Sequence, residues 1–165
     1  MAVIVREARP GDGSGIARCH LDSAATYVEQ DPELYRMPDE DGFVEWIEES
    51  LLAGHADHEL ELVGEVGGEI AGHLEGHLIE PMDTARWQMV RYVGERRLYV
   101  DALAITRTHR RHGVGRALME AAESWALDRG AAMVALDTWI DSPVSVPFYE
   151  ALGYARRSII FQKRL

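Results

Sequence analysis

Cysteine is nearly absent from this chain of 165 residues, which holds only Cys19. One cysteine cannot form an internal disulfide, so the fold depends on its core, and a chain of this length can bury enough apolar surface without cross-links. No apolar run approaches the length of a membrane span, and the N-terminus lacks the basic and then apolar layout of a signal peptide. We therefore expect one domain over residues 1–165, a cytoplasmic location and no membrane partner.

Basic residues are scarce, since 17 Lys and Arg stand against 28 Asp and Glu, for a net charge of −11. An acidic surface repels phosphate backbones, which argues against a nucleic-acid partner. The imbalance lies in the first 60 residues, which hold half of the acidic residues and only four arginines. We expect this half either to attract a cationic partner or simply to keep the protein soluble.

Apolar periodicity and turn residues predict an alternation of strands and helices. Strands are predicted at residues 2–8, 59–65, 69–79, 97–106, 131–138 and 158–164, and helices at 12–27, 41–53, 115–129 and around 148–149. Asp12 or Ser14 is the expected cap of the first helix, and Ser145 of the last. Gly67-Gly68 predicts a hairpin turn, Gly130 a helix end, and residues 81–94 an irregular excursion. The strand at 97–106 is apolar on both faces and is expected to be central. This order predicts an α/β fold in which helices cover both faces of one mixed sheet.

A basic turn with two glycines follows the strand at 97–106 and opens the next helix. Its residues are Arg110, Arg111, His112, Gly113, Val114, Gly115, Arg116 and Ala117. Amides in the first turn of a helix have no partner within the helix, and the helix dipole favours an anion there. Glycine permits close approach of the backbone to a ligand, and arginine pairs with phosphate oxygens. The segment predicts a diphosphate site, and the alternative is a tight turn with incidental arginines.

Other phosphate motifs fit this turn less well. A P-loop needs Gly-Lys-Ser/Thr, and a dinucleotide fingerprint needs glycine where Leu118 stands. Arg110, Gly113 and Gly115 instead match the Gln/Arg-x-x-Gly-x-Gly/Ala signature of the GCN5-related N-acetyltransferases (GNAT). The chain resembles this family in element order over essentially its whole length. The resemblance implies the GNAT fold, with a mixed and mostly antiparallel sheet.

The resemblance also implies a way of binding acetyl-CoA as co-substrate. The amides of residues 112–117 are implied to bind its pyrophosphate. Backbone groups near Leu103, Ala104 and Ile105 are implied to pair with the pantetheine arm like an added strand, and the amide of Ile105 to stabilise the oxyanion.

A second match lies near the C-terminus, where Phe148-Tyr149 and Gly153-Tyr154 fit the family's Phe-Tyr and Gly-Phe/Tyr positions. In the family a tyrosine at the place of Tyr149 points its hydroxyl at the CoA sulfur, which implies that Tyr149 is the acid. The alternative is a core aromatic pair. Ser142 stands where the family often has asparagine, and we expect it to bond a pantetheine amide loosely.

Asp101 is the predicted base. It is the only charged residue between Leu98 and Ile105, in a strand with a buried pattern, and burial raises the pKa of a carboxyl group toward proton-accepting use. The alternative is an aspartate paired with an arginine. Glu75, His73 and His77 on the preceding strand are rival bases, and a water chain is a further one.

The resemblance implies acetyl transfer to a primary amine by direct attack in a ternary complex, with no covalent acyl-enzyme. The acidic segment at residues 12–53 favours a small cationic amine as acceptor. A protein N-terminus or lysine is the second candidate acceptor, and a catalytically silent acyl-CoA-binding module is the alternative from another class. The choice between acetyl and longer acyl donors stays open.

Two histidine pairs, His55 with His58 and His109 with His112, raise the question of a metal. Neither pair sits on a sequence-evident helix and only one cysteine is available, so we expect no metal. Members of the family often form dimers through their C-terminal strands. The apolar residues of the segment 158–164 would suit such an interface as well as a core.

Overall fold

The sheet has five strands and runs through the whole molecule. The computed structural model describes residues 2–163, and the strands are β1 (Val3–Glu7), β2 (Glu59–Val66), β3 (Glu69–Ile79), β4 (Arg97–Ile105) and β5 (Met133–Leu136). They lie in the order β1-β2-β3-β4-β5. Neighbours are antiparallel except β4 and β5, which are parallel. This confirms the mixed, mostly antiparallel sheet, although β3 rather than β4 is the middle strand.

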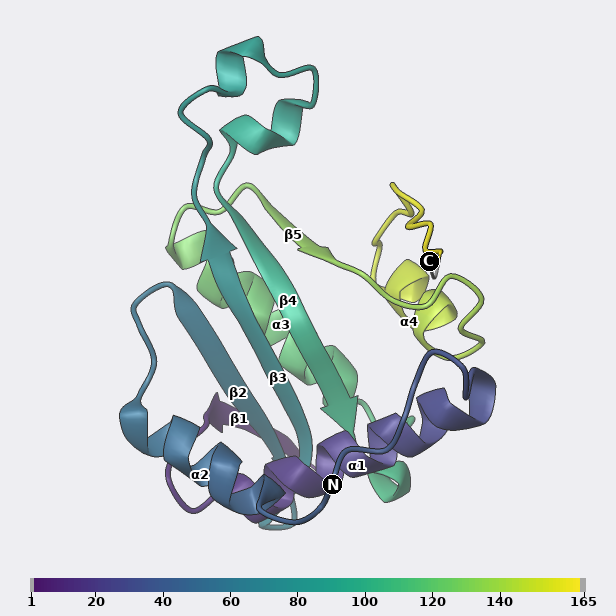
Figure 1. The fold of residues 1–165 in the computed structure, drawn as a ribbon. Coiled ribbons are helices and arrows are strands. Elements are labelled where there is room, and N and C mark those ends of the chain that lie inside the picture. The colour runs from purple at the N-terminus through teal and green to yellow at the C-terminus, as the bar shows by residue number, and fades with distance from the viewer. Residues whose placement is uncertain (1, 164–165) are drawn as a thin grey trace.

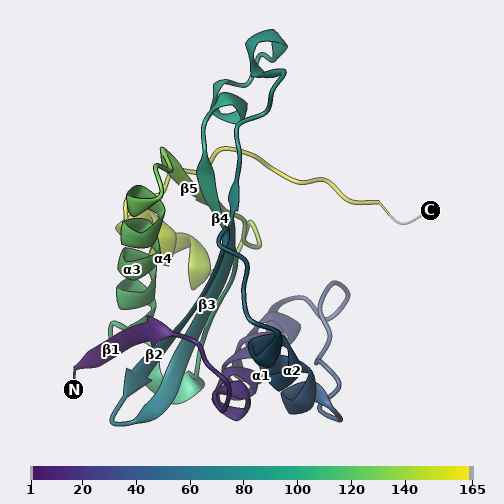
Figure 2. The same ribbon diagram turned by 90° about the vertical axis from the view of Figure 1, so that its left-hand side faces the viewer.

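Helices cover both faces of the sheet, as expected. Figure 2 shows α1 (Gly13–Gln30) and α2 (Phe43–Ala53) on one face and α3 (Val114–Asp128) and α4 (Ser145–Ala151) on the other. Each layer has its own core, because each helix turns an apolar stripe toward the sheet. Buried residues of the first layer include Ile16 and Ile47, which pack with Val63 of β2. The α3 layer is larger and includes Leu74, Leu98, Leu118 and Met119.

The turns occur at the predicted glycines, but the helices are not capped by the predicted residues. Gly67 and Gly68 both have positive φ in the β2–β3 hairpin, and Gly130 has positive φ after α3. Asp12 precedes α1 without capping it through its side chain. The N-cap residue of α4 is Val144, and the Ser142 hydroxyl oxygen, two residues earlier, accepts from the Ser145 amide at 3.0 Å. Capping by Ser145 itself was therefore wrong.

The C-terminal strand predicted at residues 158–164 was wrong over the residues described. Residues 155–163 have no strand pairing, and Ile159, Ile160 and Phe161 are 61, 69 and 91% exposed. β-branched and aromatic residues favour extended backbone, but a strand also needs a neighbour for its ladder of hydrogen bonds. Figure 2 shows this tail leaving the body of the molecule. Residue 164 lies outside the described residues.

The excursion between β3 and β4 forms an arm that projects beyond the sheet (Figure 1). It contains two short 3-10 turns, Ala85–Trp87 and Arg91–Gly94. The Arg86 guanidinium lies 3.9 Å from the centre of the exposed Trp87 ring. Among residues 2–163, no helix combines the length and hydropathy needed to cross a bilayer.

Candidate active site

The strands β4 and β5 separate halfway along β4. Residues Arg97–Val100 pair with Met133–Leu136, and the pairing stops there. The register with β3 shifts at the same point, since Glu75 lies opposite Ala102 and Gly76 opposite Val100. Asp101 is therefore the extra residue of a β-bulge, and a bulge bends its strand. The bend leaves residues 101–105 without a strand neighbour on the β5 side (Figure 1).

Backbone groups point into this opening from alternate residues of β4. The Thr106 amide donates to the Ala71 carbonyl at 2.9 Å, so Thr106 faces β3. Since strand residues alternate, the N–H and C=O groups of Leu103 and Ile105 face the open side. Ala104, opposite His73, directs its groups to β3. The predicted pairing of all three residues with a ligand is therefore corrected for Ala104.

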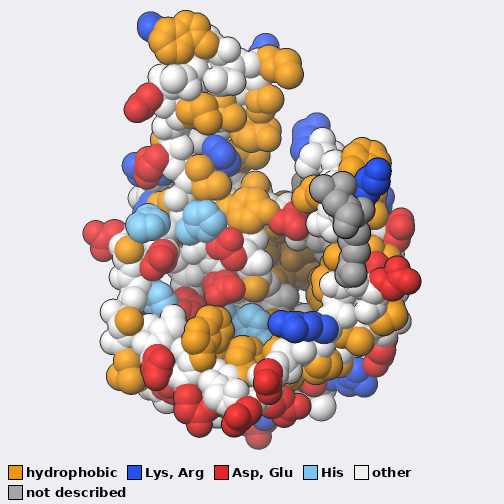
Figure 3. All heavy atoms as spheres, viewed as in Figure 1, with side chains coloured by type: hydrophobic (Ala, Val, Ile, Leu, Met, Phe, Trp, Pro, Cys, Tyr) orange, Lys and Arg blue, Asp and Glu red, His pale blue; other side chains and the backbone are white. Residues whose placement is uncertain are grey.

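A cavity of about 160 Å³ lies in the opening between the separated strands. Its wall comes from α1, β4, the end of β5 and α4, and the lining residues are His20, Ser23, Tyr27, Val100, Asp101, Ala102, Leu103, Ala104, Leu136, Asp137, Thr138 and Tyr149. In Figure 3 the same face is hollowed beside the sheet, and histidine and acidic side chains gather near the hollow. The cavity thus joins distant parts of the chain at one place.

Tyr149 lies at the wall of this cavity, where the sequence predicts an acid. Its ring packs against Phe148 and Tyr154 with centroid separations of 5.1 and 5.9 Å. Burial raises the pKa of the Tyr149 hydroxyl well above its usual value, and Tyr27 and Asp137 raise it further. The phenol therefore keeps its proton at neutral pH. Tyr149 is thus both part of an aromatic pair and a residue of the cavity wall.

Asp101 also lines the cavity, but the burial argument for it was wrong. Its side chain is 41% exposed, and Oδ2 lies 2.7 Å from Nδ1 of His77. The sequence pattern failed here because the bulge breaks the alternation of inward and outward side chains. The partner is a histidine of the neighbouring strand, not an arginine.

The rival bases on β3 differ widely in their surroundings. His73 is buried and contacts Glu61 and His20. Burial raises the pKa of Glu75; His73 lowers it, and the charges of Glu61 and Asp101 raise it further. Among these residues and His77, none lines the cavity. Sequence reasoning missed His20, which does line it, because a histidine within an amphipathic helix gives no signal of its own.

The turn before α3 has the backbone geometry predicted for an anion site. Gly113 has φ of +86° with open space around it, and α3 begins at Val114. The Ala117 amide donates to the Gly113 carbonyl at 3.0 Å, so the helical ladder starts there and Ala117 is not a free donor. The amides of Val114, Gly115 and Arg116 precede that bond and have no hydrogen-bond acceptor within residues 2–163.

Gly115 is also required by packing, since a Cβ there would lie 3.2 Å from the Phe148 ring. Arg111 has φ of +66°, an uncommon conformation for a residue with a side chain. His112 turns back to the Arg110 carbonyl through Nδ1, at 2.8 Å. Both side chains are exposed at the turn.

Arg110 has a different role from the one predicted. Its guanidinium donates to the Thr26 hydroxyl and the Asp22 carbonyl of α1, both at 2.7 Å, and to the Ile105 carbonyl at 3.3 Å. The side chain therefore ties the turn to α1 instead of pointing at an anion. Arg116 is exposed and lies 3.8 Å from Glu120.

Ser142 is buried, its hydroxyl oxygen accepts from the Ser145 amide at the start of α4, and it is not among the residues that line the cavity. The Val146 amide also donates to the Ser142 carbonyl, at 3.4 Å. The predicted contact with a pantetheine amide would require a bound molecule to reach this covered hydroxyl. The structure supports a structural role for Ser142 at this helix start.

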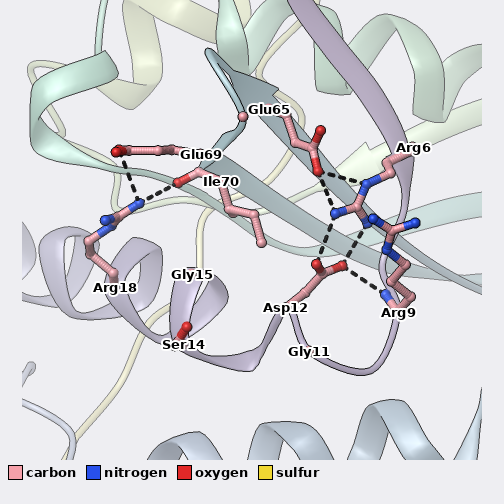
Figure 4. A pocket seen from close by; sticks show the side chains of 11 residues that line it. Arg6, Arg9, Gly11, Asp12, Ser14, Gly15, Arg18, Glu65, Glu69 and Ile70 are labelled. Carbon is pink, nitrogen blue, oxygen red and sulfur yellow. Dashed lines mark hydrogen bonds and ion pairs between the residues drawn. The ribbon is translucent and has the colours of Figure 1, made fainter.

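A larger hollow lies at the opposite end of α1, about 510 Å³ in volume, and Figure 4 shows its lining. Arg6 fills one side and donates to Asp12 at 2.7 and 2.8 Å and to Glu65 at 2.8 Å. Arg18 donates to the Ile70 carbonyl on the other side. The hollow is open and polar, and its charges are largely paired with one another. Size alone therefore does not identify the active site.

Known proteins match this arrangement. The model of the acetyltransferase (GNAT) family matches residues 20–154. The chain belongs to the GNAT acetyltransferase family. N-alpha-acetyltransferase 30 of Schizosaccharomyces pombe is 32% identical over 64 residues, which span 39% of this chain and 43% of that relative.

Solved structures share the fold. A mutant of the BH1408 protein of Bacillus halodurans has a TM-score of 0.81 at 21% identity, with 98% of this chain and 99% of that chain covered. An aminoglycoside acetyltransferase from an uncultured soil metagenomic sample has a TM-score of 0.66 at 21% identity, with 100% and 99% covered. The acetyltransferase AAC(6')-Iy, solved with a CoA-based bisubstrate analogue, has a TM-score of 0.64 at 17% identity, with both chains fully covered.

GNAT enzymes use acetyl-CoA, and the residues present here fit that co-substrate. The first-turn amides of α3 lie before the helical ladder, and Gly113 leaves open space where another residue would place a side chain. The backbone of Leu103 lines the cavity without a strand neighbour on that side, and the Ile105 amide faces the same side while the Ile105 carbonyl accepts from Arg110. Among residues 2–163, no group of three or more His, Cys, Asp and Glu side chains is arranged to hold a metal.

Proposed function

We propose that residues 1–165 act as one catalytic domain that transfers the acetyl group of acetyl-CoA to a small cationic primary amine. The attack is direct, in a ternary complex, with no metal. The observation that carries the proposal is the cavity at the open edge of β4, with Tyr149 in its wall. The open start of α3 follows the same strand after a short turn.

Each part of this edge has a role toward the donor. Acetyl-CoA supplies an acetyl group already activated as a thioester. The amides of Val114, Gly115 and Arg116 bind the diphosphate at the positive end of α3. The backbone of Leu103 and Ile105 orients the pantetheine arm as an added strand would. The Tyr149 hydroxyl, which keeps its proton at neutral pH, protonates the leaving sulfur.

The acceptor end of the cavity favours a cation. Asp101 and Asp137 both line it, and no arginine or lysine does among the residues described. Tyr99 donates its hydroxyl to Asp137, which holds that carboxylate at the cavity. Two carboxylates attract an ammonium group and raise its local concentration. Because Asp101 is exposed, its carboxylate suits binding of the ammonium better than removal of a proton.

The test is release of free thiol from acetyl-CoA across a panel of amines, with thermal stabilisation by CoA measured alongside. The panel holds a polyamine, an aminoglycoside, an amino-acid amide, and peptides with a free N-terminus or a lysine. We expect turnover with a small cationic amine and a higher Tm in the presence of CoA. Stabilisation without turnover by any amine would favour the silent binding module, and no stabilisation at saturating CoA would contradict the donor site.

A protein N-terminus is the second candidate acceptor. The partial similarity to N-alpha-acetyltransferase 30 favours it, although that match spans less than half of either chain. Faster thiol release with the N-terminal peptide than with every small amine would select it.

A further inference from the structure

A line of hydrogen-bonded side chains starts at the cavity and crosses the layer between the sheet and the helices α1 and α2. His20 of α1 lines the cavity, and its Nε2 lies 3.0 Å from Nδ1 of His73 on β3. Nε2 of His73 lies 2.9 Å from Oε1 of Glu61 on β2. Oε2 of Glu61 lies 2.8 Å from Nε2 of His55, which reaches the surface. The line therefore joins side chains of α1, β3 and β2 with His55 of the loop that follows α2.

Glu61 sets the direction of these hydrogen bonds. Burial raises the pKa of Glu61, but the hydrogen bond from His73 and the nearby histidines outweigh burial, so the net pKa is lowered and Glu61 is ionised at neutral pH. An ionised carboxylate only accepts hydrogen bonds, so Nε2 of His73 carries a proton. With no second proton on His73, its Nδ1 accepts from Nε2–H of His20. The remaining nitrogen of a neutral His20, Nδ1, is left with a free lone pair.

His20 itself is kept neutral by its surroundings. Burial lowers the pKa of His20 to about 4, His73 lowers it as well, and Glu61 raises it. Phe43 of α2 covers the ring edge-on, with centroids 6.3 Å apart. The charged and titratable groups that share the cavity wall are Asp101, Asp137, Tyr27 and Tyr149. An ammonium bound among these groups would meet a neutral imidazole, whose weak basicity is raised by the Glu61 carboxylate behind His73.

Acetylation of an ammonium leaves one proton over. The C–N bond of the amide forms, the C–S bond of the thioester breaks with its electron pair on sulfur, and Tyr149 protonates that sulfur. One amine proton restores Tyr149, and the other must leave the site before attack. We propose that His20 is the base that takes this proton on Nδ1, and that His73 and Glu61 are positioning residues that fix its tautomer. The proposal rests on the proposed function.

The positive charge formed on His20 is stabilised along the line. Glu61 accepts from Nε2–H of His73, and Nδ1 of His73 accepts from Nε2–H of His20, so the carboxylate stabilises the charge on His20 without itself becoming protonated. His20 gives its proton to solvent when the products leave the cavity, and Glu61 also contacts the exposed His55. This order of carboxylate, imidazole and base follows the logic of a catalytic triad, with one imidazole more. Asp101 and His77, 41 and 40% exposed, have no comparable support behind them.

The tautomers are tested first, on the free protein, by nitrogen-15 NMR of its histidine rings. We expect Nε2 of both rings to carry a proton at pH 7 and Nδ1 of His20 to carry none. In Glu61→Gln, whose side chain can also donate, His20 is expected to shift toward a mixture of tautomers. A proton on Nδ1 of His20 in the wild type would overturn the proposal, whatever the acetylation assay gives.

The base is tested by the variant His20→Gln, which keeps a polar side chain but cannot take up a proton. We expect kcat with an alkylamine to fall about 100-fold at pH 7, with little change in the affinity for CoA. The loss should shrink for trifluoroethylamine, which is largely deprotonated at that pH, and as the pH rises.

Glu61→Gln should lower kcat about tenfold and change KM little. His58→Gln, at the exposed histidine near His55, is the matched control and should keep the wild-type rate.

The possible results separate this proposal from the proposed function. Wild-type turnover together with an unchanged kcat in His20→Gln across pH would overturn the His20 assignment and leave the function standing. No turnover by the wild type with any amine would overturn both. An equal loss in His20→Gln for trifluoroethylamine and for the alkylamine would also count against His20 as a base.

Discussion

Helices α1 and α3 both begin in a glycine-rich turn, yet only one of the two starts is open. Residues 11–15 read Gly-Asp-Gly-Ser-Gly, and residues 113–115 read Gly-Val-Gly. At α1, the Glu48 carboxylate of α2 accepts from the Gly11 amide at 2.8 Å and from the Gly13 amide at 2.6 Å. At α3, no carboxylate of the described residues takes that place.

The comparison teaches what makes a helix start a ligand site. At both starts, the first amides have no partner within their own helix and lie at the positive end of the helix dipole. The protein fills one with its own anion and thereby fixes α2 against α1. The other start, at α3, is the one that we propose binds the anion of a ligand. Glycine content and nearby arginines do not separate the two cases, since the start of α1 also has three glycines and has Arg6 and Arg9 beside it (Figure 4).

Gly115→Val should have the largest effect and sharpen the comparison. A Cβ at residue 115 would lie 3.2 Å from Phe148, and the added methyl groups would crowd the amides that we propose bind the diphosphate. We expect the Kd for CoA, measured by calorimetry, to rise about 100-fold, or about 2.7 kcal/mol.

The matched variant is Gly15→Val, at the first turn of α1. Its Cβ would lie 2.7 Å from Ile70, so urea unfolding should show a loss of about 1–3 kcal/mol. The Kd of the folded protein for CoA should not change. If Gly15→Val weakened CoA binding as much as Gly115→Val, the two starts would not differ in the way described.

Glu48→Ala should empty the start of α1 and destabilise the fold by about 2 kcal/mol, because hydrogen bonds to a charged group are lost. Glu49→Ala, on the exposed side of α2, is the control and should stay within about 0.5 kcal/mol of the wild type. Urea unfolding measures both. Sulfate should restore part of the stability of Glu48→Ala only. No difference between the two variants would contradict the role of Glu48.

Arg110→Lys separates charge from geometry at the α3 turn. Lysine keeps the charge but cannot make the three hydrogen bonds to Thr26, Asp22 and Ile105. We expect stability to fall by about 1–2 kcal/mol and the Kd for CoA to rise about tenfold, because the turn loses its anchor on α1. Arg116→Lys is the control, with a change below about threefold. If Arg110→Lys left both the stability and the Kd for CoA unchanged, Arg110 would act only through its positive charge, as the sequence predicts.

The smallest effect is expected at Asp12, on the way the free energy of unfolding depends on pH. Burial raises the pKa of Asp12, but hydrogen bonds from Arg6 and the Arg9 amide outweigh burial and lower it below its ordinary 3.8. The stabilisation is therefore present above about pH 4 and is lost as the pH falls through the lowered pKa. Asp12→Asn should lose about 1 kcal/mol at pH 7 and less at pH 2, measured by urea unfolding. An equal loss at both pH values would contradict the ion pair with Arg6.

Local patterns predicted most of the fold. The β2–β3 hairpin, β3 over Glu69–Ile79 and the start of α3 follow from apolar period and glycine position. The order of elements and the resemblance together predicted the sheet and the family. The tail at residues 158–163 was mispredicted because propensity reports extended backbone but not the presence of a neighbouring strand.

The site was predicted less completely, because its details depend on contacts distant in sequence. The exposure of Asp101 comes from a bulge, and the anchoring of Arg110 comes from α1, some 85 residues earlier. His20 carries no local mark, and it becomes visible only when His73 and Glu61 lie beside it. The backbone geometry of the α3 turn could be predicted from the sequence, whereas the side-chain contacts of Asp101, Arg110 and His20 could not.

The most direct test of the central claim is a backbone amide NMR titration of the protein with CoA. We predict that the largest shifts occur at Gly113, Val114, Gly115 and Arg116, while Gly11 and Gly13 stay in place because Glu48 already occupies the start of α1. Large shifts at Gly11 and Gly13, with none at the start of α3, would contradict the account.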